Sequence, residues 1–506
     1  MRLIDMIIVF VYIVFIVVLG LKGRGKQEDA ADVFTASGRL SGFFHSMCVG
    51  LSIAAAYFSG LSFLIYPSVV YSDGIKIMAC LILFPVTLIL LRYWFLPKYL
   101  GAGLKYPYEI IEKRIGHSAR TVAASMFLLL RVGWLGAMLY APAVAIMAMG
   151  NLDPRWFWPI VLAMGLTCTI YTTMAGIQGL IVTDAIQMLM IAVGIAVTVG
   201  YCILNVNASV SEAFSYLQSS GRLTPFDFSF DLTRTFTIWA IMIGIMTSNC
   251  GTYMADQISL QRYLAVGDSK AASRSFLMNI IGVIIVLLLL AAVGLSTATW
   301  YHFSPDPNLP ASADKVFPYF VATQLPVGVC GVLFAALLAA TITTMNSGIN
   351  TLAATFTIDF RMAYGKPMSN QEQLRYSRRA CLIIGVVATL LAGTVEKLGT
   401  IFDITQKLMG LFLGPLLTCM LFAVTNKPFK PVFWLAGSAL SLIAGSVVIF
   451  FTEVSSLFVA PVTFTVSFTI TAIGRLLYKP DEDSSLINEQ NIQGIVSICD
   501  RNENAL

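Results

Sequence analysis

The sequence predicts an all-α polytopic membrane protein with about 13 transmembrane helices in one domain. Hydrophobic residues make up 57% of the 506-residue chain, and charged residues make up 12%. A soluble protein of this length carries about a quarter charged residues. Apolar runs of roughly 20 residues, the length that crosses the hydrocarbon core, recur along the whole chain. We therefore expect one transmembrane domain over residues 1–477 and a cytoplasmic tail over residues 478–506.

Each expected span is an apolar run bounded by polar or charged residues. The first run is too long for a cleavable signal peptide and no small-residue cleavage site follows it, so it should cross the membrane. Residues 106–120 are expected to form a short amphipathic cytoplasmic helix, and residues 205–235 the longest outer loop. The expected spans are 3–21, 43–65, 74–97, 119–149, 156–175, 179–204, 236–255, 276–300, 325–360, 380–396, 398–426, 432–452 and 457–477.

Lysine and arginine residues fall mainly in alternate loops, which predicts the orientation in the membrane. One set of loops holds clusters such as Lys98, Lys105, Lys113, Arg114 and Arg120. The opposite set holds few, among them Arg155, Arg222, Arg234, Lys315 and Lys397. Cytoplasmic loops are the enriched ones, so the N-terminus is expected outside and the C-terminus in the cytoplasm. The expected location is the plasma membrane, which is the inner membrane of a bacterial cell.

Motifs of soluble enzymes do not occur in the sequence. There is no GxxxxGK[ST], HExxH or GxSxG pattern, so neither an ATP-driven pump nor a hydrolase is indicated. The nine cysteines include no CxxC pair, and the three histidines lack metal-ligand spacing. The formal charge of +5 lies in short loops, which gives no reason to expect a nucleic-acid partner. No obligate protein partner is evident either.

The stretch 335–360 starts as an apolar helix and then fills with hydroxyl and amide groups. One face combines a small residue with hydroxyls: Ala340, Thr343, Thr344, Ser347 and Thr351. Such residues let membrane helices approach closely and bond across the interface. They could equally supply neutral oxygens to a sodium ion, with backbone carbonyls of a broken helix completing the shell. From this stretch alone, both interpretations stay open.

Two other apolar stretches carry residues that weaken a helix midway. Residues 50–67 contain Gly50, Ser59-Gly60 and Pro67, and residues 243–264 contain Gly244, Thr247, Ser248, Asn249 and Gly251. They are the second and seventh expected spans, five spans apart. Paired interrupted segments at matching positions are typical of a transporter built from inverted repeats.

Several motifs together resemble the sodium–solute symporter family, including its sialic acid, monocarboxylate and glucose branches. They are TASGRL (35–40), YAPA (140–143), AGIQGLIVTDAIQ (175–187), DQISLQRYLAVGDSKAASRS (256–275) and INTLAATFTID (349–359). The resemblance covers residues 1–477. It implies inverted five-helix repeats over 43–204 and 236–426, interrupted first and sixth core helices, an extra N-terminal helix and two extra C-terminal helices over 432–477.

The resemblance also implies which residues bind Na+. The carbonyls of Ala55, Phe58 and Ala340 and the hydroxyls of Thr343 and Thr344 would bind one sodium ion. A second ion, present in some family members, would use Asp184, Asn346 and Ser347 together with Thr343. Asn346 departs from the serine usual there. Asp184 has an equal alternative as an interfacial residue near the cytoplasmic end of its helix.

The expected solute contacts come from four core helices. Tyr57, Ser59 and Ser62 belong to the first, and Asn249 belongs to the sixth. Gln406 aligns with a substrate-binding residue of the sugar carriers, and Asp403 lies beside it. Arg131 is a charge within an apolar helix, which indicates a functional role by default and suits a carboxylate. The alternative is that Arg131 snorkels to the cytoplasmic headgroups.

The sequence thus predicts a sodium-coupled secondary symporter that imports a small polar organic solute by alternating access. Its partners would be that solute, sodium ions and the lipid bilayer, and it would not be an enzyme. A carboxylate such as sialic acid or a monocarboxylate is the expected solute class. The alternatives are a sugar or other neutral solute, a membrane sensor with a transporter-like fold, a channel, and proton in place of sodium coupling.

Overall fold

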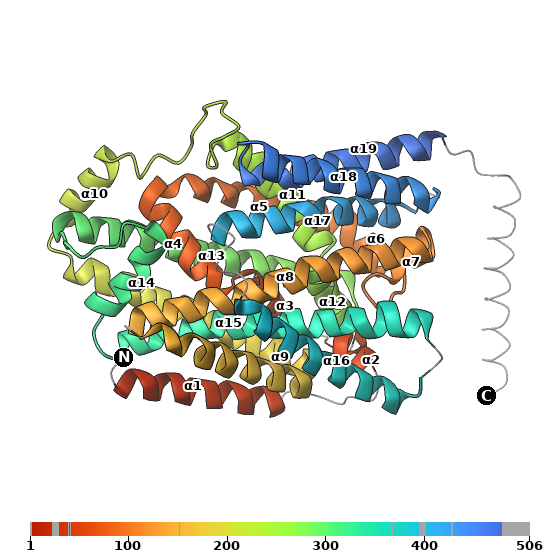
Figure 1. Cartoon of the computed structure of the whole chain (residues 1–506), viewed down its shortest axis with the longest axis horizontal. Coiled ribbons are helices and arrows are strands. Elements are labelled where there is room, and N and C mark those ends of the chain that lie inside the picture. The colour runs from red at the N-terminus through yellow and green to blue at the C-terminus, as the bar shows by residue number, and fades with distance from the viewer. Residues whose placement is uncertain are drawn as a thin grey trace, which may run out of the picture.

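The computed structural model describes residues 3–22, 30–38, 40, 42–150, 152–365, 368–393, 401–426 and 429–477. The regular elements of this part of the chain are all helices, and most run along one common direction (Figure 1). Nine helical stretches within it are long and apolar enough to cross a membrane. Two of these stretches, with 41 and 52 residues, exceed one crossing. The all-helical membrane class is confirmed, and the count of 13 spans stays a prediction.

Helices from the two chain ends form opposite edges of the bundle. The first helix, α1 (Leu3–Lys22), matches the expected span 3–21 and lies along one edge. The last two, α18 (Pro431–Phe451) and α19 (Val459–Leu477), pack against each other along the other edge (Figure 1). α1 begins at the end of the bundle opposite to the end where α19 stops, as an odd number of crossings requires. The expected tail, 478–506, lies outside the described residues.

The expected span 43–65 is two helices, α3 (Phe43–Tyr57) and α4 (Gly60–Asp73). Its predicted end at residue 65 was wrong. The helix continues through Pro67 to Asp73. Proline removes only the backbone donor to the Phe63 carbonyl, and membrane helices tolerate such a loss where neighbouring groups satisfy the freed carbonyl.

The expected span 74–97 is a chain of short helical pieces with different pitch. These are η2 (Gly74–Ile82), α5 (Leu83–Leu90), the π-helix η3 (Leu91–Phe95) and α6 (Leu96–Leu100). The short α7 (Glu109–Arg114) falls within the predicted amphipathic helix 106–120. α8 (His117–Gly150) follows and matches the span 119–149.

The expected spans 156–175 and 179–204 are the two arms of α9 (Phe157–Asn205). Gly176 separates them with φ 62° and ψ 177°. The Tyr171 hydroxyl lies 2.5 Å from Thr183 Oγ1, although 12 residues of straight helix would cover about 18 Å. The two arms therefore fold back on each other at Gly176, as two separate spans would.

Gly176→Ala is expected to lower the free energy of unfolding by about 1–3 kcal/mol, because that backbone region is essentially restricted to glycine. The measurement is thermal unfolding of the purified protein in detergent. Gly200→Ala is the matched control, since Gly200 lies in the same element and a methyl group there would meet nothing within 4 Å. Equal stability of the two variants would contradict the assigned turn.

The second half repeats the pattern of an interrupted helix followed by long helices. In order, its main elements are α10 (Val210–Ser219), the π-helix η5 (Ala240–Ile245), α11 (Met246–Met254), α12 (Gln257–Val266), α13 (Ser269–Phe303), α14 (Ala313–Gln324), α15 (Val329–Ala354), the π-helix η6 (Thr355–Met362), α16 (Asn370–Leu391) and α17 (Ile401–Thr425). Some short or polar helices were not predicted from the sequence: α2 (Ala30–Thr35), α10, α12 and α14.

α16 begins ten residues before the expected start at residue 380. Ser369 and Glu372 form a capping box at its N-terminus, in which each side chain accepts from the other residue's backbone N–H. Its first turns are polar, so a hydropathy pattern finds only the apolar part of the helix.

Candidate functional site

The first interrupted helix leaves backbone carbonyls without helical partners. α3 ends at Tyr57, and Phe58 (φ −86°, ψ 98°) and Ser59 (φ −86°, ψ 170°) are extended before α4 begins at Gly60. The Ser59 hydroxyl accepts from the Ser62 N–H at 3.4 Å and so caps α4. The last carbonyls of a helix lack intrahelical donors, so those near Phe58 can accept from, or coordinate, a ligand.

The second interruption separates α11 from α12. Asp256 has an extended backbone (ψ 126°), and its Oδ1 accepts from the Ile258 N–H at 2.8 Å. The two interruptions confirm the prediction that the first and sixth core helices are broken.

One cavity, with a volume of about 120 Å³, lies between the interrupted helices and their neighbours. It is large enough to hold several waters. Its lining includes every residue predicted to contact the solute: Tyr57, Ser59, Ser62, Arg131, Asn249 and Gln406. These residues come from α3 and α4, α8, α11 and α17, four segments far apart in the sequence. Their solute-binding role stays a prediction. The side chain of Asp403 lies outside what the structure describes.

Arg131 is buried, with a relative exposure of 4%, so it does not snorkel to the membrane surface in this structure. Its Nη2 donates to Asp256 Oδ2 at the second interruption. Its guanidinium carbon lies 4.4 Å from the centroid of the Trp134 ring, which also lines the cavity. Among the described residues, Arg131 Nε has no hydrogen-bond partner. One edge of the guanidinium is therefore fixed, while Nε keeps an unused donor.

The five residues expected to bind the first sodium ion are all buried in neighbouring segments. Ala55 and Phe58 lie where α3 ends, and α3 and α4 both pack against α15, which carries the other three residues. A methyl group at Gly60 would lie 2.5 Å from Thr341 Oγ1, which shows how closely α4 begins against α15. The arrangement is compatible with a sodium site, and ion binding there stays a prediction.

The two hydroxyls predicted to bind the first sodium ion, those of Thr343 and Thr344, have defined hydrogen-bond partners. Thr344 Oγ1 donates to the Ala340 carbonyl at 2.9 Å, which keeps two predicted ligands adjacent. Thr343 Oγ1 donates to Gln187 Oε1 at 2.5 Å, and Gln187 Nε2 has no partner among the described residues. Each threonine oxygen still has lone pairs to offer a cation, because each uses its hydrogen as a donor.

The later polar residues of α15 and η6 pair with α12 at four-residue intervals. Arg262 Nη2 donates to Ser347 Oγ at 2.6 Å, and Thr351 Oγ1 donates to Gln261 Oε1 at 3.1 Å. Gln257 accepts from Thr355 at 3.0 Å and donates to Asp359 at 3.1 Å. The hydroxyl-rich face thus serves helix contact in this part of stretch 335–360, and the sodium interpretation of Ala340, Thr343 and Thr344 stays a prediction.

Asp184 lies in a buried cluster with Arg262. Asp184 Oδ2 accepts from Arg262 Nη2 at 3.0 Å and from Ser52 Oγ at 2.6 Å. Ser347, predicted for the second sodium ion, binds the same Arg262 nitrogen. Asn346 Oδ1 accepts from Thr172 Oγ1 at 2.8 Å. Asp184 is 0% exposed, and the carboxylate is partnered by a guanidinium, which does not fit the interfacial alternative.

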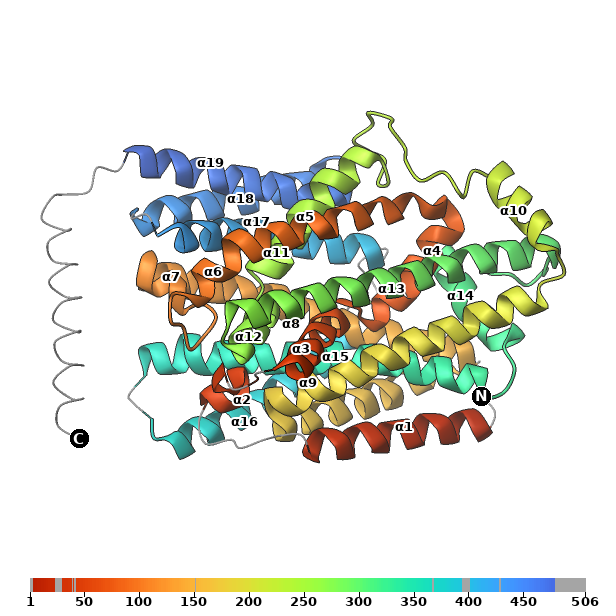
Figure 2. The same ribbon diagram turned by 180° about the vertical axis from the view of Figure 1, so that it is seen from behind.

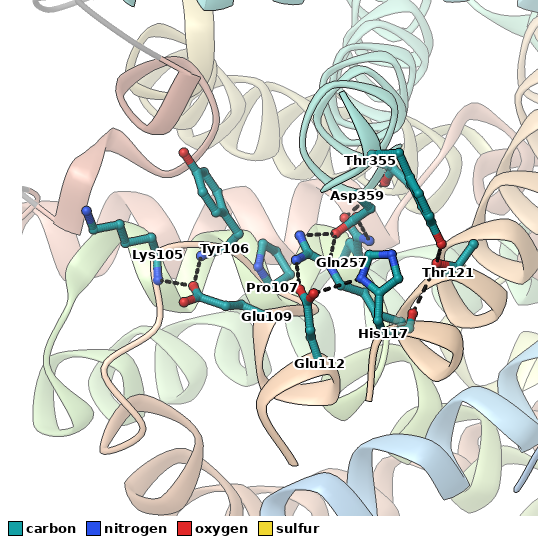
Figure 3. Close-up of polar contacts among 12 residues, drawn as sticks. Lys105, Tyr106, Pro107, Glu109, Glu112, His117, Thr121, Gln257, Thr355 and Asp359 are labelled. Carbon is teal, nitrogen blue, oxygen red and sulfur yellow. Dashed lines mark hydrogen bonds and ion pairs between the residues drawn. The ribbon is translucent and has the colours of Figure 1, made fainter. Parts of the chain in front are cut away.

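A third arginine, Arg120 of α8, binds one carboxylate of η6 and one of α7. Figure 3 shows these two carboxylates, Asp359 and Glu112, with His117 beside Glu112. Arg120 binds Asp359 Oδ1 through Nε at 2.8 Å and Nη2 at 2.7 Å, and its Nη1 donates to Glu112. His117 Nδ1 lies 2.8 Å from the other Glu112 oxygen. Partial burial acts to raise the pKa of Glu112, but the contacts with His117 and Arg120 outweigh it and lower the pKa. Three arginine–carboxylate pairs therefore lie in or next to α12, and of these residues Arg131 lines the cavity.

Four residues of the site were not predicted from the sequence: Asp256, Arg262, Asp359 and Gln187. All four lie within the quoted motifs, and Asp359 is a charge inside an expected span, which makes it a functional candidate by default. Asp256 and Arg262 lie between the expected spans 236–255 and 276–300, so this rule finds only Asp359. It would not have paired any of the four, because the partners are 78 to 239 residues apart.

Two interrupted helices that border a central cavity with several polar side chains in its lining are typical of a secondary transporter of the inverted-repeat type. The model of the sodium:solute symporter family matches residues 33–431, so this chain belongs to that family. It is a sodium-coupled symporter and not an enzyme.

Relatives and solved structures agree with this assignment. The chain is 29% identical over 419 residues to the sodium/sialic acid symporter NanT of Aliivibrio fischeri, covering 81% of this chain and 80% of that protein. It is 27% identical over 401 residues to the sodium-coupled monocarboxylate transporter 2 of Bos taurus, covering 78% of this chain and 63% of that protein. A solved substrate-bound, outward-open sodium-coupled sialic acid symporter has a similar fold, with a TM-score of 0.85, 23% identity and coverage of 95% and 99%.

Proposed function

We propose that this symporter imports a small organic carboxylate into the cytoplasm together with sodium. The observation that carries this proposal is Arg131, a guanidinium in the cavity lining whose Nη2 is held by Asp256. Its enclosed Nε has no hydrogen-bond partner among the described residues. A guanidinium matches the planar geometry of a carboxylate. The cavity lining also contains Ser59, Ser62 and Gln406, which can hydrogen-bond with other polar groups of the solute. The names of sialic acid and monocarboxylate symporters among the relatives support the same class.

The direction of import rests on the proposed orientation, with the N-terminus outside and the basic loops in the cytoplasm of the plasma membrane. α7, between spans, lies at the end of the bundle where α19 stops, and α10 lies at the opposite end (Figure 2). The membrane potential then drives a cation inward by about 2.3 kcal/mol per charge per 100 mV. Cysteine accessibility at Lys113 and Ser211, both exposed, tests the orientation with a membrane-impermeant reagent.

The test of the solute class is uptake into proteoliposomes that contain the full chain. N-acetylneuraminate, short monocarboxylates, a neutral sugar and a neutral amino acid are compared with and without a sodium gradient. Sodium-driven uptake of an anion, and not of the sugar, is expected. Robust transport of the neutral sugar alone would reject the carboxylate while leaving sodium-coupled symport in place.

The first sodium site is proposed to use Ala55, Phe58, Ala340, Thr343 and Thr344. Thr343→Ala and Thr344→Ala each remove one oxygen ligand, so each should raise the sodium concentration for half-maximal uptake by about 10-fold. The protein level in the membrane should not change. Thr297→Ala is the matched control, because that buried hydroxyl bonds only the Val293 carbonyl of its own helix among the described residues. Unchanged sodium dependence in both site variants would remove this site.

A further inference from the structure

A second hollow lies on the surface between η3 and the start of α13, away from the central cavity. Its volume is about 480 Å³, and its lining includes Arg92, Tyr93, Lys270, Ser273, Arg274 and Leu277. We call it the Arg92–Arg274 groove. α5, η3 and α6 contact α13, and Figure 2 shows α5 and α6 beside α13. Side chains of η3 and of the start of α13 line the groove.

The charge of the groove is strongly one-sided. Arg92, Lys270 and Arg274 are exposed, and in the described part of the chain no ion pair involves them. The carboxylate in the lining, Asp268, accepts from the Ala271 N–H at 3.0 Å and caps α13. Three cations therefore face one capping carboxylate, and the groove is complementary to an anion.

An apolar surface continues from the charged groove along α13. Leu277, Ile281, Ile285 and Leu288 are 38%, 43%, 48% and 51% exposed, and their spacing of three to four residues puts them on one helix face. Val86, Ile89 and Leu90 are exposed on the neighbouring α5. A small anion dissolved in water would bind to the three cations and would not contact the apolar surface. The continuous apolar stripe fits an occupant that also has hydrocarbon chains.

Tyr93 marks the level of the membrane surface in the groove. It is 71% exposed, and the Arg92 guanidinium carbon lies 5.4 Å from its ring centroid. Exposed tyrosines with basic neighbours are typical of the headgroup level. In the proposed orientation this is the cytoplasmic level, where anionic lipids are concentrated.

We propose that the Arg92–Arg274 groove binds the headgroup of an anionic phospholipid, with its acyl chains along the exposed faces of α13 and α5. The three cations would contact the phosphate groups and select an anionic over a zwitterionic lipid. The occupant is lipid, as opposed to free phosphate, because the charged hollow and the apolar stripe are continuous.

The test is a titration of the purified full chain in neutral detergent with fluorescent phosphatidylglycerol. The variant carries Arg92→Gln, Lys270→Gln and Arg274→Gln. The matched control carries Lys105→Gln, Lys113→Gln and Arg114→Gln, which removes the same charge from exposed positions around α7. We expect at least about 10-fold weaker binding by the groove variant, since each cation near a lipid surface contributes about fivefold. The control should bind like the wild type.

Three results would overturn the proposal. If the control variant lost as much affinity for phosphatidylglycerol as the groove variant, the loss would be due to general surface charge and not to the groove. Equal binding of phosphatidylcholine would remove the selectivity for an anion. Full competition by inorganic phosphate at millimolar concentration would make the hydrocarbon chains irrelevant. The single variant Lys270→Glu provides a second test if the triple variant is poorly folded, and its binding should be weaker than that of Lys270→Gln. Because no uptake is measured, an error in the proposed solute would not affect the result.

Discussion

Asp184→Asn is expected to reduce sodium-driven uptake by about two orders of magnitude or more and to lower the thermal stability of the protein. The change removes the charge opposite Arg262, which is 2% exposed and 3.0 Å from Asp184 Oδ2. Removing one partner of a buried ion pair costs about 3–5 kcal/mol, because the remaining charge stays uncompensated in a dry site. The measurements are uptake into proteoliposomes and thermal unfolding in detergent.

The double variant Asp184→Asn/Arg262→Gln separates the pair from its individual charges. Both members are then neutral and can still hydrogen-bond with Ser52 and Ser347. We expect the double variant to be more stable than Asp184→Asn alone, which is the coupling that a double-mutant cycle measures. Asp153→Asn is the control, since its contact with Arg155 is exposed and worth at most about 1 kcal/mol.

The same variants test the second sodium ion. Asp184 Oδ1 has no partner among the described residues, so an ion could still use that oxygen. If Asp184 binds a second sodium, purified wild-type protein should bind two ²²Na⁺ ions and Asp184→Asn one, with uptake persisting. If Arg262 supplies the positive charge at this position, the wild type should bind one. Two bound ions, with no rescue in the double variant, would contradict the ion-pair explanation.

Local sequence features predicted the spans well and the short polar helices poorly. Apolar length determines a membrane crossing, so α1, α8, α18 and α19 agree with expectation within two residues. α12 was not predicted, because apolar length does not reveal a short helix that carries many polar residues. It is polar along much of its length, yet it is buried because its polar groups pair with α15 and η6.

The candidate site also has a part that the sequence predicts and a part that it does not. The residues around the cavity were predictable, because serine, glycine and arginine are unusual in apolar runs. Each can be recognised from the sequence without knowledge of its partner. The arginine–carboxylate pairs were not, because a pair depends on how distant helices dock. Arg131 was expected to face either a carboxylate solute or the headgroups. The structure adds Asp256, a carboxylate of the protein itself, as its first partner.

Arg131→Lys is expected to weaken the apparent affinity for an anionic solute by about 10- to 150-fold, with sodium dependence unchanged. A lysine can still pair with Asp256, so the substitution keeps the protein's own ion pair. It cannot hold Asp256 and also present the planar pair of donors that a carboxylate accepts. The hydrogen bond that is lost involves charged groups and contributes about 1.5–3 kcal/mol.

Arg131→Gln distinguishes the solute contact from the contact with Asp256. Glutamine leaves the buried Asp256 carboxylate without a cation, so this variant should also be less stable, which Arg131→Lys should not be. Arg155→Lys is the control, because Arg155 is exposed. The measurement is the concentration dependence of uptake for the best anionic solute at saturating sodium. An Arg131→Lys variant with wild-type affinity would show that Arg131 serves Asp256 alone, and the solute's charge would then have to be recognised elsewhere in the cavity.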